Sequence, residues 1–372
     1  MSQTVRLADV CSFLDSERVP VTESDRRPGL YPYYGANGQQ GSIDGYIFDE
    51  PLVLLAEDGG YFGSKTRPIA YKVSGKCWVN NHAHVLRPRQ NCDVGYLHRV
   101  LSYYDVTKFV SGTTRPKLTK TQAETMPITL PALPEQKRIA AILERADRLR
   151  RLRRYALRLS DAYLQDEFVE MFGDLAQNPR RWESRALGEY VRFLTSGSRG
   201  WAAFVADDGP LFLRIQNVGN GRLLLDDIAH VRPPDTAEAG RTKVCPRDLV
   251  LSITADLGRT AVIPRGFPEA YVNQHLALAR LAGVNPVFVA GYFSSKHGRA
   301  QIQRLDRAGV KSGLNFDDIR GLMVPAPPIS LQDEYERIVR RYEHLRAQQR
   351  EAERQAGHLF QTLLQWAFRG EL

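Results

Sequence analysis

Two long stretches of this sequence lack the residues that interrupt helices, and they constrain the fold more than any other feature. The first, Glu135–Phe172, contains no Gly and no Pro, and the second, Leu331–Phe368, contains only Gly357. A proline-rich segment precedes each stretch, at residues 126–134 and 323–328. Because proline is tolerated in the first turn of a helix but breaks its interior, both stretches are predicted to be helices that begin just after the prolines. A helix of about 38 residues is roughly 57 Å long, which exceeds the width of a small domain.

The segments outside these helices have the composition of folded, loop-rich domains. Short runs such as Leu52–Leu55 and Leu249–Ile253 are rich in β-forming residues and alternate with Gly, Pro, Asn and Asp. This pattern is typical of compact α+β domains, so the predicted fold class is α+β. The predicted division is a first domain at 1–131, a hinge and long helix at 132–178, a second domain at 179–327, and a hinge and long helix at 328–372.

An internal repeat relates the two halves of the chain. The aligned pairs are Pro51–Leu54 with Asp248–Leu251, Trp78–His82 with Tyr271–His275, Thr114–Leu118 with Val310–Leu314, and Gln136 with Gln332. All of them fall at offsets of about 193 to 197 residues and in the same order, which predicts that the two domains share a fold. Chance similarity between apolar strands is the alternative.

Apolar residues in both long helices recur at the alternating three- and four-residue spacing of a coiled-coil seam. The seam residues are Ile139, Ile142, Ala146, Leu149, Ala156 and Tyr163 in the first helix, and Tyr335, Ile338, Tyr342, Leu345, Leu359, Leu363 and Trp366 in the second. The first helix leads away from the first domain, so a second helix that packs on it must run back antiparallel. This predicts an antiparallel coiled coil between two similar domains, an approximate twofold axis, and a chain end near the first domain. The alternative is that each helix covers only its own domain.

Composition and missing motifs exclude several classes of protein. Hydrophobic residues make up 43% of the chain and charged residues 25%, as in globular proteins. The longest apolar run, Leu52–Ala56, is far shorter than the roughly 20 residues that span a bilayer, and Met1–Val10 does not resemble a signal peptide. Asn285–Phe288 lacks the second proline of amino-methyltransferase motifs, and no phosphate-binding GxxxxGK[ST] loop occurs. A cytoplasmic protein without catalytic residues or a cofactor of its own is expected.

A few residues of the first domain are of the types that bind zinc. They are Cys77, His82, His84 and Cys92. Because the repeat has alanines opposite Cys77 and His84, structural roles are favoured over a metal site. His82 recurs as His275 in the second half, and each follows an amide residue. Both are predicted to be buried, hydrogen-bonded histidines that organise the fold.

The charge balance and the duplication suit DNA as a ligand. Lys and Arg number 51 against 42 Asp and Glu, a net charge of +9, and most of the excess lies in residues 179–327. Similar domains at a set separation suit a duplex that repeats every ~34–36 Å. Arg, Lys, Asn and Gln read base edges, while cations and hydroxyls hold phosphates. Loop residues of these types are Tyr34, Asn37, Gln39, Lys65, Arg67, Thr113, Thr114, Arg115 and Lys117 in the first domain, and Arg214, Gln216, Asn217, Arg259, Lys311 and Ser312 in the second. The alternative is that these loops are ordinary surface turns.

The proline-rich run that leads into Leu133–Ile139, and the Gly/Ser/Thr-basic loop before each proline run, resemble Type I restriction-modification specificity subunits along the whole chain. The resemblance implies a subunit without catalytic activity, whose two target-recognition domains read the halves of a split, asymmetric DNA site and whose helices set the gap. It further implies two methyltransferase subunits as partners, which bring S-adenosylmethionine, and restriction/translocase subunits, which use ATP and Mg²⁺. The start of the second helix, Leu331–Glu334, departs from the family's Glu-Gln-basic pattern. An alternative function for the same architecture is a scaffold whose domains bind proteins, with DNA binding incidental.

Overall fold

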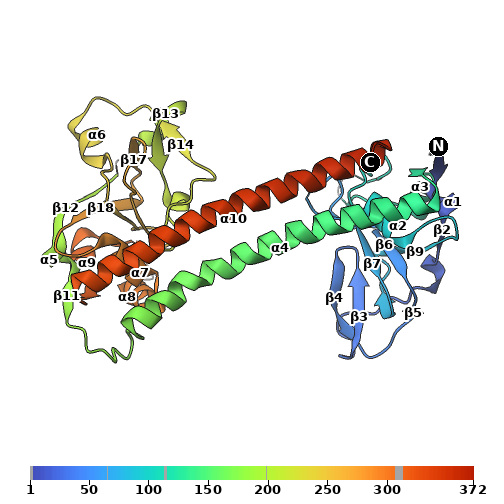
Figure 1. Ribbon diagram of the computed structural model, residues 1–372, viewed down its shortest axis with the longest axis horizontal. Coiled ribbons are helices and arrows are strands. Elements are labelled where there is room, and N and C mark those ends of the chain that lie inside the picture. The colour runs from blue at the N-terminus through green and yellow to red at the C-terminus, as the bar shows by residue number, and fades with distance from the viewer. Residues whose placement is uncertain (1–2, 65, 113–114, 198, 306–312) are drawn as a thin grey trace. The chain divides into compact units, whose positions relative to one another are not determined.

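The computed structural model divides into two compact units. Unit 1 is Met1–Arg154 with Glu351–Leu372, and unit 2 is Tyr155–Arg350. The structure describes residues 3–64, 66–112, 115–197, 199–305 and 313–372. The long helices are α4 (Leu133–Phe172) and α10 (Ile329–Arg369), and each has one end in each unit (Figure 1). Both units combine sheets with helices, so the predicted α+β class and the predicted long helices are confirmed.

Unit 1 is built around a sheet with the strand order β2-β9-β6-β7 and a second sheet with the order β4-β3-β8-β5. Its elements are β1 (Gln3–Arg6), α1 (Leu7–Val10), β2 (Cys11–Phe13), η1 (Asp15–Glu17), β3 (Tyr31–Gly35), β4 (Gly38–Ile43), β5 (Phe48–Asp49), β6 (Leu52–Ala56), β7 (Ala70–Val73), β8 (Lys76–Val79), β9 (Ala83–Pro88), α2 (Val94–Ser102), α3 (Lys120–Glu124) and β10 (Pro127–Leu130). Every residue of β6 is buried, which explains its unbroken apolar sequence. This strand forms the centre of the unit, and the loop that follows it leads to the candidate site.

Unit 2 repeats this plan with the sheet orders β12-β18-β15-β16 and β14-β13-β17. Its elements are β11 (Ser184–Ala186), α5 (Leu187–Tyr190), β12 (Val191–Ser196), η2 (Trp201–Phe204), β13 (Val205–Leu213), η3 (Ile215–Asn217), β14 (Ala229–Val231), α6 (Ala237–Thr242), β15 (Leu249–Ser252), β16 (Thr260–Val262), β17 (Ala270–Val272), β18 (Leu276–Leu281), α7 (Pro286–Ser294), α8 (Lys296–Leu305), α9 (Phe316–Gly321) and β19 (Met323–Pro325). The parallel pair β3–β8 of unit 1 has its counterpart in the parallel pair β13–β17. The predicted internal repeat is confirmed at the level of topology.

The repeat extends to single hydrogen bonds. Gln136, at the start of α4, accepts the backbone N–H of Asp93 at 2.8 Å and donates to two backbone carbonyls. Gln332, at the start of α10, accepts the backbone N–H of Asn285 at 2.9 Å and donates to the carbonyl of Pro327. Both glutamines are fully or almost fully buried. The same residue therefore joins each long helix to the helix that packs beside it, α2 or α7.

The recurring histidines have matching backbone contacts. The backbone N–H of His82 and that of His275 each donate to an Asn side chain two residues earlier, at 2.9 and 3.2 Å. The His82 ring bonds Asp58 at 2.6 Å, and the His275 ring bonds Thr254 at 2.7 Å. Their predicted hydrogen bonding is confirmed. The predicted burial is wrong for His82, whose side chain is 39% exposed because the loop that holds it lies at the surface.

The long helices run antiparallel within each unit. In unit 1 the first turns of α4 and the last turns of α10 share one core, which includes Ile139, Leu143, Phe360 and Leu364. Phe368 and Leu372 pack against the same core, as the predicted position of the chain end requires. In unit 2 the end of α4 meets the start of α10, where the ring of Tyr163 stacks on that of Tyr342 with centroids 6.0 Å apart.

The predicted seam residues differ in how far they are buried within each unit. Ile139, Tyr335 and Tyr342 are buried, and Ile142, Ile338 and Leu363 are half-buried. Leu149, Tyr163, Leu345, Leu359 and Trp366 are instead 40% to 48% exposed. Near the end of α10 the buried residues are Phe360, Leu364 and Ala367, one position after the predicted ones. One residue turns a helix by about 100°, and the buried face follows the globular part of the unit as well as the other helix. None of the described helices is long and apolar enough to cross a membrane.

Candidate nucleic-acid interface

Two predicted loops of unit 1 meet at the end of the buried strand β6. The residues after this strand are Glu57, Asp58 and Gly59. The side chain of Asn37, from the first loop, donates to the carbonyl of Gly59 at 3.0 Å. The backbone N–H of Leu118, which follows the third loop, donates to the carbonyl of Glu57 at 2.7 Å. The tertiary fold thus brings together loops that are 20 to 60 residues apart in the sequence.

Two adjacent acidic residues hold the cations of the third loop. The carboxylate of Glu57 is 2.7 Å from Arg18 and 3.0 Å from Lys117, and the carboxylate of Asp58 lies 3.5 Å from Arg115. The backbones of Ser111 and Lys117 bond each other in both directions, which closes this loop. Arg115 is 70% exposed and Lys117 is 46% exposed, so both side chains still face solvent. The loop therefore presents its cations in a defined position.

A buried charge cluster lies beneath this loop. The ring of His84 is 2.6 Å from Asp15 and 2.8 Å from the carbonyl of Leu118. Burial favours a raised pKa for the carboxyls of Asp15 and Glu57, but hydrogen bonds from His84 to Asp15, and from Arg18 and Lys117 to Glu57, hold both pKa values below their usual range. These groups stabilise the charged form of each carboxylate.

The same cluster contains residues of the types that bind metal ions. Asp15, Glu57 and His84 offer ligand atoms within 4.8 Å of one another. The nearby cations, Arg18 and Lys117, already neutralise the carboxylates, so this geometry favours an anchor for the loop over a metal site. Cys77 and Cys92 are buried free thiols, and burial raises the pKa of Cys77 to about 11.

Acid should weaken this anchor, because a carboxyl whose pKa is lower in the folded chain than in the unfolded chain stabilises the fold only while ionised. That stabilisation is complete above the unfolded pKa of about 4 and is lost as the pH falls below it. We expect Asp15→Asn to lower the free energy of unfolding at pH 7, and the difference from wild type to shrink towards pH 3. Denaturant unfolding followed at several pH values measures this difference. A difference that does not change with pH would contradict the assigned cause.

The remaining described residues that were predicted in unit 1 make local contacts. Arg67 lies over the ring of Tyr61, with its guanidinium 4.5 Å from the centroid. Gln39 is exposed on β4, and its side chain donates to the carbonyl of Gly41. Tyr34 is half-buried, and this burial raises the pKa of its hydroxyl. Lys65, Thr113 and Thr114 lie outside the described residues.

Unit 2 brings together fewer of its predicted residues. Arg214 and Gln216 both lie beside the exposed Asp227, and Arg259 pairs with Asp256. Asn217 is 1% exposed, and its side chain bonds the carbonyls of Leu224 and Asp227 and the backbone N–H of Arg214. Asn217 therefore shapes its loop, and its contact with DNA stays a prediction that the burial of its side chain does not favour. Lys311 and Ser312 lie outside the described residues.

The residues that sequence reasoning missed are the acidic ones. Glu57 and Asp58 directly follow a buried strand, where charged side chains are often functional. The sequence prediction of DNA contacts considered cations, amides and hydroxyls, and therefore did not include these carboxylates. Arg18 and Asp15 come from a separate segment at η1. No spacing in the sequence connects them with Lys117.

Comparison with known proteins agrees with this arrangement. Residues 2–156 match the family described as the Type I restriction modification DNA specificity domain. The match covers the first part of the chain, less than half of its length. The specificity domain therefore coincides closely with the part of unit 1 that ends at Arg154, and the resemblance to Type I specificity subunits is confirmed.

Relatives and solved structures extend the comparison. A putative type I restriction enzyme specificity subunit of Haemophilus influenzae is 36% identical over 138 residues, 37% of this chain and 35% of that protein. The EcoBI specificity subunit of Escherichia coli is 27% identical over 176 residues, 44% of this chain and 36% of that protein. These matches thus span about a third of the length of each relative.

Two solved structures share the fold along almost the whole chain. The specificity subunit of a Type I system from M. genitalium superposes with a TM-score of 0.67 at 15% identity, covering 99% of this chain and 96% of that one. A chain from a type I restriction-modification assembly gives a TM-score of 0.56 at 20% identity, covering 100% and 98%. The fold that follows the specificity domain is therefore also that of these subunits.

Proposed function

We propose that this chain is the non-catalytic DNA-recognition subunit of a Type I restriction-modification complex, and that each unit reads one half of a split, asymmetric site. The observation that carries the proposal is the convergence in unit 1 of Asn37, Arg115 and Lys117 on the end of β6. An amide and two cations on one exposed surface are the groups that hold bases and phosphates. Methylome sequencing of a host with and without this chain tests the proposal, because a bipartite motif must disappear with the chain.

Loss of the third-loop cations should weaken DNA binding without unfolding the protein. We expect Arg115→Ala and Lys117→Ala each to lower the affinity for DNA. If the residue contacts a phosphate, the salt dependence of binding should fall by roughly one charge. If the residue reads a base, the binding free energy should fall by about 1–3 kcal/mol for the target sequence only. Lys120→Ala is the matched control, since Lys120 is a similarly exposed lysine that pairs with Glu124 on α3. Fluorescence anisotropy with target and scrambled duplexes at several salt concentrations measures both effects. If DNA binding does not depend on sequence and its affinity is unchanged in both variants, the alternative function as a protein-binding scaffold is favoured.

The proposal includes protein partners on the long helices. Large apolar side chains on α4 remain exposed, among them Leu152, Tyr155, Leu159 and Val169 at 48% to 58%. In unit 2, Leu159 borders a groove of about 640 Å³ between α4 and α10, where the buried amide oxygen of Gln349 has no hydrogen-bond partner. Exposed apolar side chains in a row favour a protein contact. We infer that methyltransferase subunits dock on these helices and bring S-adenosylmethionine, and that restriction subunits, where present, bring ATP and Mg²⁺.

The helices are also proposed to set the gap between the half-sites. Each residue of a helix adds about 1.5 Å. Inserting seven residues at matched positions of α4 and α10 should change the preferred gap by roughly three base pairs, since a base pair rises 3.4 Å. The methylated motif of a host that carries the insertion gives the gap directly. An unchanged gap would exclude this role for the helices.

A further inference from the structure

Helix α8 carries an unusual excess of positive charge. Its ten residues, Lys296–Leu305, contain Lys296, Arg299 and Arg304 but no acidic residue. No ion pair among the described residues involves any of these three cations. Other exposed arginines of unit 2, such as Arg241, do have an acidic neighbour. A helix with unneutralised cations attracts an anion from outside the chain.

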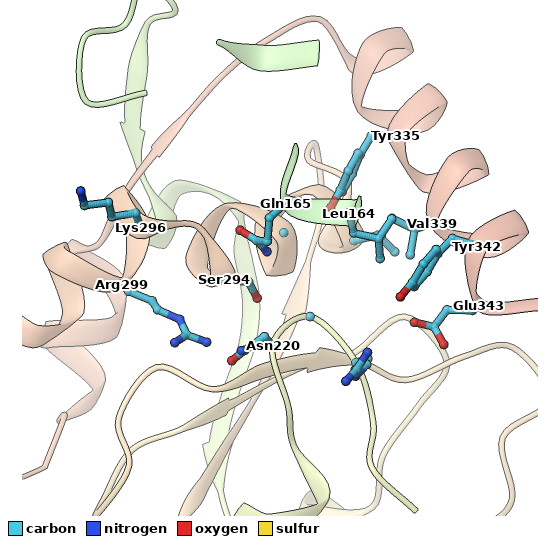
Figure 2. A pocket seen from close by; sticks show the side chains of 14 residues that line it. Leu164, Gln165, Asn220, Ser294, Lys296, Arg299, Tyr335, Val339, Tyr342 and Glu343 are labelled. Carbon is cyan, nitrogen blue, oxygen red and sulfur yellow. The ribbon is translucent and has the colours of Figure 1, made fainter. Parts of the chain in front are cut away.

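Two of these cations, Lys296 and Arg299, line a cavity. A cavity of about 600 Å³ is lined by Lys296, Arg299, Asn220 and Gln165, with Glu343 at another part of its wall. The side chain of Arg299 points toward Asn220, whereas that of Lys296 extends away from them at the edge of the cavity (Figure 2). A neighbouring cavity of about 270 Å³ shares Asn220 and Arg299 and adds Arg259. We call the joined cavities the α8 cleft. Guanidinium, ammonium and amide groups in one cleft are donors for the oxygens of an anion.

A tyrosine hydroxyl at the wall of the cleft makes no hydrogen bond with the described residues. This residue is Tyr335, which is 2% exposed and lines the larger cavity. A Cβ on Gly291 would lie 2.7 Å from this hydroxyl, so only glycine leaves the space open. The hydroxyl is therefore open to a hydrogen bond with a molecule that enters the cavity.

Comparison of the repeats shows that the cleft is particular to unit 2. The equivalent of Gly291 in unit 1 is Arg99, which is 5% exposed and pairs with Asp147 at 3.0 Å and with Glu144. The position that is a glycine in unit 2 therefore carries a large, buried and ion-paired side chain in unit 1. Between α2 and α3, moreover, the described residues of unit 1 form no counterpart of α8. Unit 2 has therefore acquired both the opening and the cations that line it.

The cleft adjoins a loop already predicted to contact DNA. Gly258 packs on α8, since a Cβ there would lie 3.0 Å from a methyl carbon of the buried Ile302. The next residue, Arg259, lines the smaller cavity together with Arg299. A strand of DNA bound at this loop would therefore have α8 beside it.

We propose that the α8 cleft binds phosphodiester groups of the DNA backbone next to the half-site that unit 2 reads. The proposal rests on the proposed function in DNA recognition. Lys296 and Arg299 supply the charge, and Asn220 and Gln165 supply amide donors to phosphate oxygens. Such contacts carry no base information, so the cleft strengthens binding to any sequence and holds the register of unit 2.

The double substitution Lys296→Ala and Arg299→Ala in the full chain tests the proposal. Each lost phosphate contact lowers the slope of log K against log salt by about 0.9. We expect the slope to fall by roughly 2, and affinity to fall by the same factor for target and scrambled duplexes. Arg241→Ala is the control, because it removes an exposed, ion-paired arginine of the same unit and should leave the slope unchanged. An unchanged melting temperature of the double variant excludes unfolding.

The outcomes separate this inference from the proposed function. A wild-type slope in the double variant, with wild-type protein still selecting its target, would overturn the α8 cleft alone. A loss confined to the target duplex would overturn it as well, because that result indicates base readout. Inorganic phosphate at 10 mM could raise the melting temperature of the wild type but not of the double variant. If the two proteins then also show the same slope of log K against log salt for DNA, the cleft binds a free anion and the proposal is wrong. Wild-type protein without sequence preference would instead refute the proposed function.

Discussion

Replacing Glu57 by Ala is expected to lower the free energy of unfolding of unit 1 by about 3 kcal/mol. The carboxylate neutralises Arg18 at 2.7 Å and Lys117 at 3.0 Å, and the side chains of Glu57 and Arg18 are each only 12% exposed. Removing one partner of a buried ion pair costs about 3–5 kcal/mol, because the remaining charge stays buried without compensation. We expect the lower end, since some solvent reaches both groups. Hydrogen exchange of β6 and β9 measures the loss within unit 1.

A surface pair in the same unit provides the control. Glu50 pairs with Arg87 at 2.6 Å, but these side chains are 32% and 46% exposed. Exposed pairs contribute about 0–1 kcal/mol, so Glu50→Ala should have little effect. Glu57→Ala should also weaken DNA binding, because Lys117 loses its anchor. Equal stability losses in the two variants would contradict the assignment of Glu57 as the buried anchor of the loop.

The second large effect is expected at Phe168, near the end of α4. Its ring is 1% exposed and contacts Phe172, Phe288 and Tyr335, with centroids 4.7 to 5.8 Å apart. Replacing a buried phenylalanine with alanine removes these contacts and leaves a cavity, at a cost of about 3–5 kcal/mol. We expect Phe168→Ala to destabilise unit 2 by this amount and to loosen both long helices where they enter it.

The next residue along the helix supplies the comparison. Val169 is 48% exposed, and an exposed substitution usually changes stability by less than about 0.5 kcal/mol. Hydrogen exchange of α7 and of the start of α10 should increase in Phe168→Ala and stay at the wild-type level in Val169→Ala. A loss below about 1 kcal/mol in Phe168→Ala would mean that α4 adds little to the core of unit 2.

Sequence patterns predicted the helices and the repeat, because these features depend on local or periodic signals. Prolines end one element before α4 and α10, and long stretches without Gly or Pro propagate a helix. The aligned segments of the two halves became equivalent strands such as β6 and β15. Matching contacts at Gln136 and Gln332 preserve the equivalence. Such signals can be read from the order of residues along the chain alone.

The faces of the helices and the composition of the site were decided by packing. A seam drawn by spacing alone put Leu359 inside, whereas Phe360 is the buried residue, because the buried face of α10 follows its contacts with the rest of unit 1 as well as with α4. Asn217 looked like a reader of bases, and the curvature of its own loop buries it. Such outcomes depend on three-dimensional contacts that no spacing along the chain encodes.

The order of helices and domains follows from where prolines, glycines and apolar residues stand along the chain, since these act over a few neighbouring residues. The meeting of Glu57 with Arg18 and Lys117, and the opening of the α8 cleft at Gly291, follow only from the folded arrangement. Coulombic pairing and cavity volume depend on distances in space between residues separated by tens of positions. Those distances are defined only once the whole unit has folded and its elements pack against one another.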